Sequence, residues 1–223
     1  MSLRACCTSL ILIAISLTIS LRGADPAPSH AFEKSIVAFE QRDQSNPPPR
    51  DANLFIGSSS IVKWKTLAAD FPHAAVINRG FGGSRIPDSI YYANRIVIPY
   101  HPKRIFLYAG DNDLASKRTP EQVAADFKTF VETVRAGLPD VAIHFISIKP
   151  SPVRAKLLEQ ARSANQLIEA YIKQGKNMTF IDVFTPMLGP DGQARPELFG
   201  PDKLHMNEAG YALWTKIMSP MVN

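Results

Sequence analysis

The chain has 223 residues, a length that suits one compact domain rather than two. Hydrophobic residues make up 45% of it and charged residues 20%, a balance typical of a globular chain with a buried core, which excludes a disordered or low-complexity protein. The formal charge of +5 comes from scattered basic residues that form no run or stripe, so we expect no nucleic-acid partner.

Residues 1–23 have the pattern of a signal peptide. Arg4 gives a short basic start, and the segment from Leu10 to Leu21 holds no charge but is short of the ~20 residues that span a bilayer. Both cysteines, Cys6 and Cys7, lie in this leader, so the mature chain has no disulfide and no thiolate chemistry. We expect a secreted or periplasmic protein with no stable membrane insertion after leader cleavage. An uncleaved anchor is the alternative.

Residues 24–52 form a spacer with one short helix before the main domain. Apolar residues from Ala31 to Gln41 are spaced as on an amphipathic helix. The prolines at 47–49 cannot continue that helix and favour an extended segment. The main domain is therefore expected to cover residues 53–223.

In this domain, short apolar runs rich in Ile, Val and Phe alternate with helix-like stretches. The predicted strands are Asn53–Gly57, Ala74–Asn78, Arg104–Tyr108, Val141–Ile148 and Met178–Val183. The main predicted helices are Ser60–Asp70, Pro87–Ile98, Pro120–Ala136, Pro152–Gln174 and Asn207–Met218, with Thr119 and Ser151 as expected N-caps. This alternation predicts a parallel sheet that is covered on both faces, with functional side chains directly after the strands.

The loops after the first two strands offer a hydroxyl and exposed backbone. Ser58–Ser60 follow the first strand and lead into a helix, whose unpaired N–H groups favour developing negative charge. Helix capping alone is the alternative for these serines. Gly80–Gly83 would let a backbone N–H face a substrate, or would form an ordinary turn. Ser84 is interpreted as a cap rather than a nucleophile.

Asn112 follows the third strand and lies between Asp111 and Asp113. An amide can donate to an oxyanion without depending on a protonation state. An Asx turn is one alternative. A metal site at the two aspartates is another, although no nearby histidine or third acid completes it.

Asp202 precedes His205 by three positions, just before the last predicted helix. At this spacing an aspartate can turn back and hold one ring nitrogen, which leaves the other nitrogen to act as a base. The remaining histidines lack such a setting and are interpreted as surface or structural residues. They are His30, His73, His101 and His144.

Taken in order, these four segments resemble the GDSL/SGNH hydrolase family over essentially the whole mature chain. Residues 57–59 resemble its Gly-Asp-Ser block, Gly83 matches the glycine of the second block, residues 110–113 match the third, and residues 202–205 match the last. Ser58 stands where the family has an aspartate, which is not the triad acid. Ile61 occupies the last position of a Gly-x-Ser-x-Gly elbow, which argues against an ordinary α/β-hydrolase.

The resemblance implies a flavodoxin-like, three-layer α/β/α sandwich with a mainly parallel sheet of about five strands. It implies a carboxylic ester hydrolase with Ser59 as nucleophile, His205 as base and Asp202 as the residue that orients it. The oxyanion hole would consist of the N–H groups of Ser59 and Gly83 and the side chain of Asn112. No metal or organic cofactor is expected.

The substrate is expected to be a small-molecule ester. A short domain without an evident lid insertion favours a small acyl group such as acetyl, carried by a carbohydrate. Lysophospholipids or short-chain lipid esters are the main alternative. A non-catalytic secreted binding protein on the same fold is another. A flavodoxin-like nucleotide binder is disfavoured, since residues 80–84 match no phosphate fingerprint. The sequence does not predict the oligomeric state.

Overall fold

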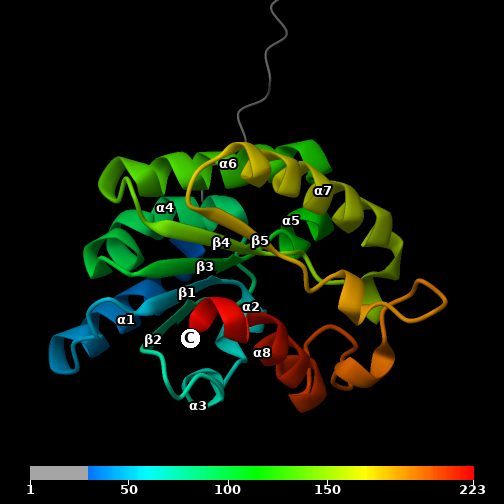
Figure 1. Ribbon diagram of the computed structural model, residues 1–223, viewed down its shortest axis with the longest axis horizontal. Coiled ribbons are helices and arrows are strands. Elements are labelled where there is room, and N and C mark those ends of the chain that lie inside the picture. Colours follow the sequence, from blue (N-terminus) through cyan, green and yellow to red (C-terminus); the bar gives the residue numbers. More distant parts are fainter. Residues whose placement is uncertain (1–29) are drawn as a thin grey trace, which may run out of the picture.

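The computed structural model describes residues 30–223, so the predicted signal peptide lies outside the described residues. Its centre is a five-stranded, wholly parallel sheet with the strand order β2-β1-β3-β4-β5. The strands are β1 Asn53–Gly57, β2 Val76–Gly80, β3 Arg104–Tyr108, β4 Ala142–Ile146 and β5 Met178–Ile181. The predicted fold class, a parallel sheet between helical layers, is confirmed (Figure 1).

Five long helices and several short ones surround the sheet. The long helices are α1 Glu33–Ser45, α4 Ile86–Ile96, α6 Pro120–Gly137, α7 Leu158–Gln174 and α8 Glu208–Val222. The short ones are α2 Ser59–Val62, α3 Leu67–Asp70, α5 Asp111–Ala115, and the 3-10 turns η1 His30–Phe32, η2 Ile98–Tyr100, η3 Pro152–Leu157, η4 Thr185–Met187 and η5 Pro196–Leu198. Over residues 30–223, no helix has the length and apolar character needed to cross a membrane.

Alternate strand residues bury two separate cores. Leu54 and Ile56 of β1 belong to the core under α1, α4, α6 and α7. Phe55, between them, belongs to the core on the other face, with Trp64 and Trp214. A parallel strand buried on both faces has no wet side, which explains the continuous apolar runs. In Figure 1, α4, α6 and α7 lie on one side of the sheet and α3 and α8 on the other.

The helix predicted over Ser60–Asp70 is instead two short helices, α2 and α3. Between them the chain turns so that the side chain of Trp64 is buried, while Lys63 and Lys65 remain exposed. The Trp64 ring packs edge-on against Phe55, at 5.8 Å between ring centroids. Periodicity alone favours a regular helix, but the break leaves Trp64 fully buried, and burying a side chain of this size is worth about 1.5–3 kcal/mol relative to leaving it exposed.

Strand β2 begins and ends two residues later than predicted. Its register with β1 pairs Asn53 with Val76 and Gly57 with Gly80. Arg79, which the sequence places in a loop, therefore lies within the strand, where its guanidinium forms an ion pair with Asp43 of α1 at 2.6 Å. The carboxylate partner of Arg79 lies on a distant helix, which the local sequence pattern does not reveal.

The two predicted N-caps behave differently. The Thr119 hydroxyl accepts a hydrogen bond from the Gln122 N–H, which confirms the cap of α6. Ser151 makes no capping hydrogen bond, and Pro152 opens the 3-10 turn η3 with a kink at Arg154 before α7 begins. The prediction of one helix over Pro152–Gln174 was therefore wrong over its first turns.

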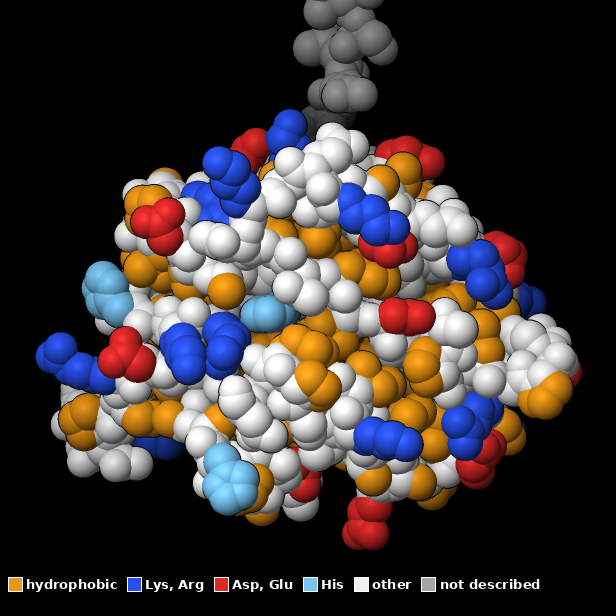
Figure 2. Space-filling model, in the orientation of Figure 1, with side chains coloured by type: hydrophobic (Ala, Val, Ile, Leu, Met, Phe, Trp, Pro, Cys, Tyr) orange, Lys and Arg blue, Asp and Glu red, His pale blue; other side chains and the backbone are white. Residues whose placement is uncertain are grey.

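Charged side chains of both signs are interspersed on the face drawn in Figure 2, with hydrophobic side chains between them. Large hydrophobic side chains that remain exposed within the described part of the chain are Tyr91, Val153 and Leu167.

Candidate active site

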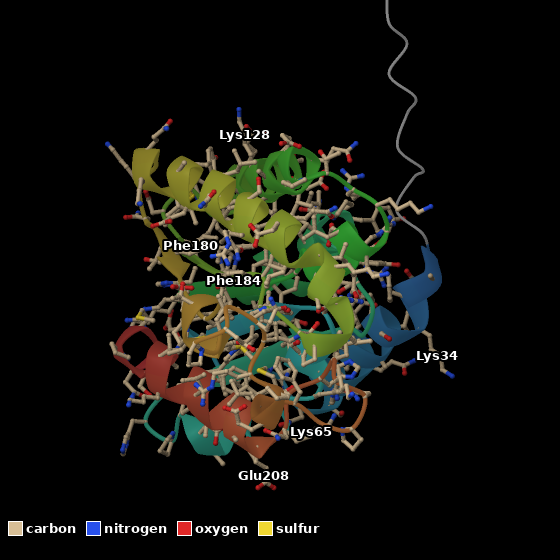
Figure 3. The ribbon with its side chains drawn as sticks, turned by 90° about the vertical axis from the view of Figure 1, so that its right-hand side faces the viewer. Lys34, Lys65, Lys128, Phe180, Phe184 and Glu208 are labelled. Carbon is tan, nitrogen blue, oxygen red and sulfur yellow. The ribbon has the colours of Figure 1, made fainter. Side chains whose placement is uncertain are left out.

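The loops that follow β1, β2 and β3 meet at one edge of the sheet. In Figure 1, α2 and α5 lie to the right of the strands that they follow, and Figure 3 turns that side toward the viewer. The Phe81 N–H donates to the Gly57 carbonyl at 2.9 Å, which joins the first two loops. A Cβ on Gly82 would lie 3.9 Å from the Ser59 Cβ. The glycine loop therefore runs directly against the candidate nucleophile.

Ser59 is the first residue of α2, directly after a sharp turn at Gly57. Gly57 has φ +138°, and a Cβ there would lie 1.8 Å from the Tyr108 carbonyl oxygen, so only glycine fits. The Ser58 N–H donates to that same carbonyl at 3.0 Å. Ser58 and Ser60 are buried, whereas Ser59 is partly exposed. Of the three serines, Ser59 is therefore the one placed to meet a substrate.

His205 and Asp202 lie beside Ser59, in the spacing that the sequence suggested. His205 Nε2 is 3.0 Å from Ser59 Oγ, and His205 Nδ1 is 2.6 Å from Asp202 Oδ2. The other oxygen of Asp202 accepts the backbone N–H groups of Leu204 and His205 at 3.0 and 2.9 Å. The Asp202 carboxylate thus holds both the backbone turn of residues 202–205 and the imidazole ring of His205. Such a chain of groups can remove a proton from a serine hydroxyl.

The carboxyl group of Asp202 is strongly biased toward its charged form. The hydrogen bond from the His205 ring lowers its pKa most, and the backbone N–H groups of His205 and Leu204 lower it further. The side chain of Asp202 is 49% exposed and that of His205 is 20% exposed. The charged carboxylate therefore persists at neutral pH while the ring remains accessible from solution.

The predicted oxyanion donors, Ser59, Gly83 and Asn112, come from three neighbouring loops. Gly83 has φ +85°, and a Cβ on it would meet no atom within 4 Å, so the space in front of its backbone is open. Asn112 Nδ2 donates to the Ser84 carbonyl at 3.1 Å, which places the amide next to the glycine loop. Ser84 itself is buried and makes no capping contact; Arg85 is the N-cap residue of α4.

The two aspartates around Asn112 have partners within the protein. Asp111 forms an ion pair with Arg154 at 2.9 Å, and Asp113 accepts the Ile86 N–H at 3.1 Å. Burial raises the pKa of Asp113 to about 7. In the described range 30–223, no three His, Cys, Asp or Glu side chains are grouped as metal ligands would be.

Lys149 and Arg154, which no sequence motif indicated, also lie at this edge. Lys149 is 3% exposed, and its Nζ donates to the Leu204 carbonyl at 3.0 Å. Burial lowers its pKa, while the nearby Asp111 carboxylate opposes that shift. Both residues follow the fourth predicted strand, so the rule that sites lie after strands would have pointed to them.

The other described histidines lie on the surface or in the core, away from Ser59. His73 and His101 are exposed. His144 is buried in β4 and stacks on Phe106 at 4.5 Å between ring centroids, and burial lowers its pKa to about 4. These findings agree with a surface or structural interpretation. For His30 only the backbone is described.

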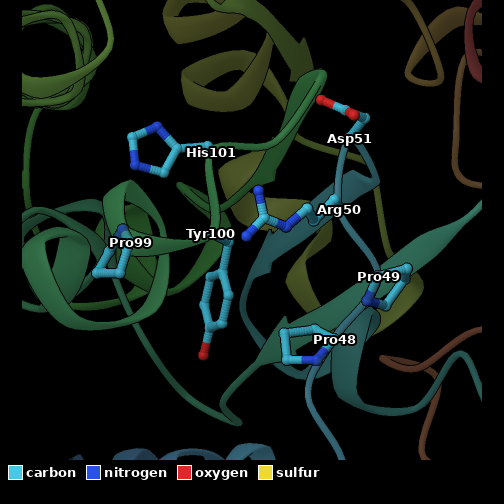
Figure 4. A pocket seen from close by; sticks show the side chains of 7 residues that line it. All are labelled: Pro48, Pro49, Arg50, Asp51, Pro99, Tyr100 and His101. Atoms are coloured by element: carbon cyan, nitrogen blue, oxygen red, sulfur yellow. The ribbon is translucent and has the colours of Figure 1, made fainter.

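A cavity of about 370 Å³ lies at the opposite edge of the sheet, before the first residues of β1 and β3 (Figure 4). Its lining residues are Pro48, Pro49, Arg50, Asp51, Pro99, Tyr100 and His101. Because Ser59 and Asn112 follow the other ends of those strands, the cavity has no part in the arrangement around Ser59.

A family model and several solved structures match this chain. The model of the GDSL-like Lipase/Acylhydrolase family matches residues 57–213. Comparison with curated proteins finds no match. Among solved structures, a candidate platelet activating factor from Streptococcus pneumoniae is similar with a TM-score of 0.76 and 20% identity, over 86% of this chain and 92% of that one.

Two further solved structures have the same fold. A GDSL-like lipase from Bacteroides thetaiotaomicron has a TM-score of 0.71 and 19% identity, over 84% of this chain and 96% of that one. A variant of an acetyl-xylooligosaccharide esterase from Geobacillus has a TM-score of 0.63 and 15% identity, over 78% of this chain and 95% of that one.

Proposed function

The chain belongs to the GDSL-like lipase/acylhydrolase family and is an ester-bond hydrolase, and from this premise we propose that it cleaves small acyl esters with a Ser59-His205-Asp202 triad. The observation that carries the proposal is the continuous contact from Asp202 Oδ2 to His205 Nδ1 at 2.6 Å and from His205 Nε2 to Ser59 Oγ at 3.0 Å. A capping serine has no need of a histidine at its hydroxyl, so capping alone does not account for this contact.

In the proposed reaction, His205 Nε2 takes the proton of Ser59 as Oγ forms a bond to the ester carbonyl carbon. The resulting oxyanion collapses, the ester C–O bond breaks, and His205 gives its proton to the departing alcohol. Water then repeats the sequence on the acyl-enzyme, and His205 again takes and returns the proton. Asp202 holds the ring in the required tautomer and stabilises the imidazolium.

The proposed oxyanion hole consists of the backbone N–H groups of Ser59 and Gly83 and one amide hydrogen of Asn112. In the described part of the chain, the Gly83 N–H has no protein acceptor, and Ser59 begins its helix, so its N–H has no intrahelical acceptor. The second Nδ2 hydrogen of Asn112 is also free of protein acceptors there. Three donors in place before charge develops are the arrangement that stabilises a tetrahedral intermediate.

We propose an acetyl ester of a carbohydrate as the substrate class. Among the described residues, the large hydrophobic side chains that remain exposed are Tyr91, Val153 and Leu167, and of these Val153 lies next to the histidine loop, where its backbone N–H donates to the Lys203 carbonyl. A long acyl chain would need a wider apolar surface to leave water. The similar acetyl-xylooligosaccharide esterase acts on a substrate of this class. The predicted leader would export the protein to where such polymers occur.

The test begins with hydrolysis of p-nitrophenyl acetate by the purified protein, with Ser59→Ala as the control. Loss of turnover in that variant alone supports the serine mechanism, and equal turnover in both overturns it. Rates on acetylated xylo-oligosaccharide, p-nitrophenyl octanoate and a lysophospholipid then decide the substrate class. A preference for either lipid-like ester would contradict the carbohydrate assignment. If no ester is turned over and an organophosphonate fails to label Ser59, the non-catalytic binding protein becomes the better account.

A further inference from the structure

The amide of Asn112 is held from its oxygen side by Arg154. Arg154 donates from Nη2 to Asn112 Oδ1 at 2.8 Å, while Asn112 Nδ2 donates to the Ser84 carbonyl at 3.1 Å. A flipped amide would turn its N–H₂ toward the guanidinium and its oxygen toward a carbonyl, so both contacts would become repulsive. The two contacts together therefore fix which end of the amide faces the glycine loop.

Arg154 is in turn fixed by Asp111, the residue before Asn112. Its Nη1 forms an ion pair with Asp111 Oδ2 at 2.9 Å, and Asp111 Oδ1 accepts the Asn112 N–H at 3.0 Å. The side chain of Arg154 is 21% exposed and that of Asp111 is 8% exposed, so water weakens this pair less than it weakens a surface pair. Arg154 and Asp111 thus hold both the side chain and the backbone of Asn112.

The same loop also contacts the histidine side of the site. The Lys149 ammonium donates to the Leu204 carbonyl at 3.0 Å, and the Val153 N–H donates to the Lys203 carbonyl at 3.1 Å. Residues 149–154 therefore contact the segment next to His205 as well as Asn112. Arg154 lies in the turn before α7, where its backbone departs from helical geometry, with φ −108° and ψ 27°.

From these contacts we infer that Arg154 is a positioning residue for the ester hydrolysis, acting through the Asn112 amide. It orients that amide so that one N–H is directed at the oxyanion, and its positive charge on the amide oxygen makes that N–H a stronger donor. Arg154 touches Asn112 rather than the reacting atoms, so its effect should require Asn112. This inference rests on the proposed function, because it assigns Arg154 to the same oxyanion hole.

The test is a double-mutant cycle with Arg154→Met and Asn112→Ala, in which kcat and KM are measured on p-nitrophenyl acetate. We expect Arg154→Met to lower kcat about 10- to 100-fold with KM within about twofold, because a misdirected donor is lost only in the transition state. Added to Asn112→Ala, the same substitution should change kcat by less than about threefold. Arg154→Lys, which keeps one donor and the charge, should recover part of the loss.

Arg162→Met is the matched control, since Arg162 lies on α7 and pairs with Glu159 away from Asn112. Full activity in Arg154→Met, or a full multiplication of the two losses in the double variant, would overturn the inference. If Arg154→Met does not fold, Arg154→Lys alone and combined with Asn112→Ala serves as the cycle. Retained turnover in Ser59→Ala and Asn112→Ala would instead overturn the proposed function, so the two failures are distinguishable.

Discussion

Ser59 Oγ lies 3.0 Å from His205 Nε2, although 146 positions separate the two residues in the chain. Ser59 is placed by the turn at Gly57, at the end of the strand next to the centre of the sheet. His205 is held by the hydrogen bond of its ring to Asp202, and the chain beside it is held by the hydrogen bond from Lys149 to the Leu204 carbonyl. Each group is therefore fixed by its own loop before a substrate binds, which is the preorganisation that acyl transfer needs.

The first prediction concerns which of the three serines acts. Ser59→Ala should abolish measurable turnover of p-nitrophenyl acetate, because it removes the only hydroxyl of the three at hydrogen-bond distance from His205. Ser58→Ala should retain at least about half of the activity and the same thermal stability, since the Ser58 hydroxyl is buried with no hydrogen-bond partner among the described residues. Inactivation by Ser58→Ala with Ser59→Ala active would contradict the assignment.

The second prediction concerns the acid of the triad. Asp202→Asn should lower kcat on the order of 10²- to 10⁴-fold, since an amide N–H facing Nδ1 favours the wrong ring tautomer. The side chain of Asp202 is half exposed, so water can replace part of its effect and the loss should lie at the lower end. Asp182→Asn is the control, because among the described residues the Asp182 carboxylate accepts only the Thr185 N–H, in the segment after β5. Equal kcat in both variants would remove Asp202 from the mechanism.

Parts of this structure could be predicted because their cause is local. The bounds of β1 and β3 match the prediction, since a strand buried on both faces is a continuous apolar run that can be recognised in the sequence. Parallel strands direct the loops that follow them to one edge of the sheet, which is why Ser59, Gly83 and Asn112 are expected near one another. Asp202 and His205 are expected instead from their three-residue spacing before the last helix and from the family resemblance. The ion pairs of Arg79 and Arg154 could not be predicted, because the carboxylate partner of each lies on another element.

The third prediction compares the two glycines with positive φ near Ser59. Gly57→Ala should destabilise the protein by several kcal/mol or prevent folding, because its Cβ would overlap the Tyr108 carbonyl. Gly83→Ala meets open space and should cost only about 1–2 kcal/mol of backbone strain. It should nevertheless lower kcat, since the strain shifts an N–H proposed to bind the oxyanion. Thermal unfolding and kcat measured together check this, and a folded Gly83→Ala with full activity would contradict it.

The fourth prediction follows from the buried Asp113 carboxyl. Burial raises its pKa to about 7 from an ordinary 3.8, so the folded protein binds a proton there that the unfolded chain has lost. Between these values, the free energy of unfolding contributed by Asp113 falls as pH rises. Relative to wild type, Asp113→Asn should therefore become more stable by about 2–3 kcal/mol from pH 4 to pH 7 in urea denaturation. A constant difference across this range would show that Asp113 ionises normally.

The fifth prediction has the opposite sign and comes from His144. Burial, with a smaller contribution from the charge of Arg104, lowers its pKa to about 4 from 6.5. Below pH 6.5 the unfolded chain gains a proton that the folded protein does not bind, so stability falls as pH falls toward 4. His144→Phe keeps the stack on Phe106, and neither ring nitrogen of His144 has a hydrogen-bond partner to lose among the described residues.

His144→Phe should therefore lose about 1–2 kcal/mol less stability than wild type when the pH is lowered from 7 to 5. Urea denaturation at both values gives this difference directly, and an equal loss in the two proteins would mean that His144 is protonated in the folded state. Because Asp113 and His144 act with opposite signs between pH 4 and 6.5, their contributions partly cancel in the wild type. In His144→Phe, the fall in stability with rising pH that Asp113 causes should therefore be steeper than in the wild type. In Asp113→Asn, the rise in stability that His144 causes should be steeper. The double variant should show neither contribution.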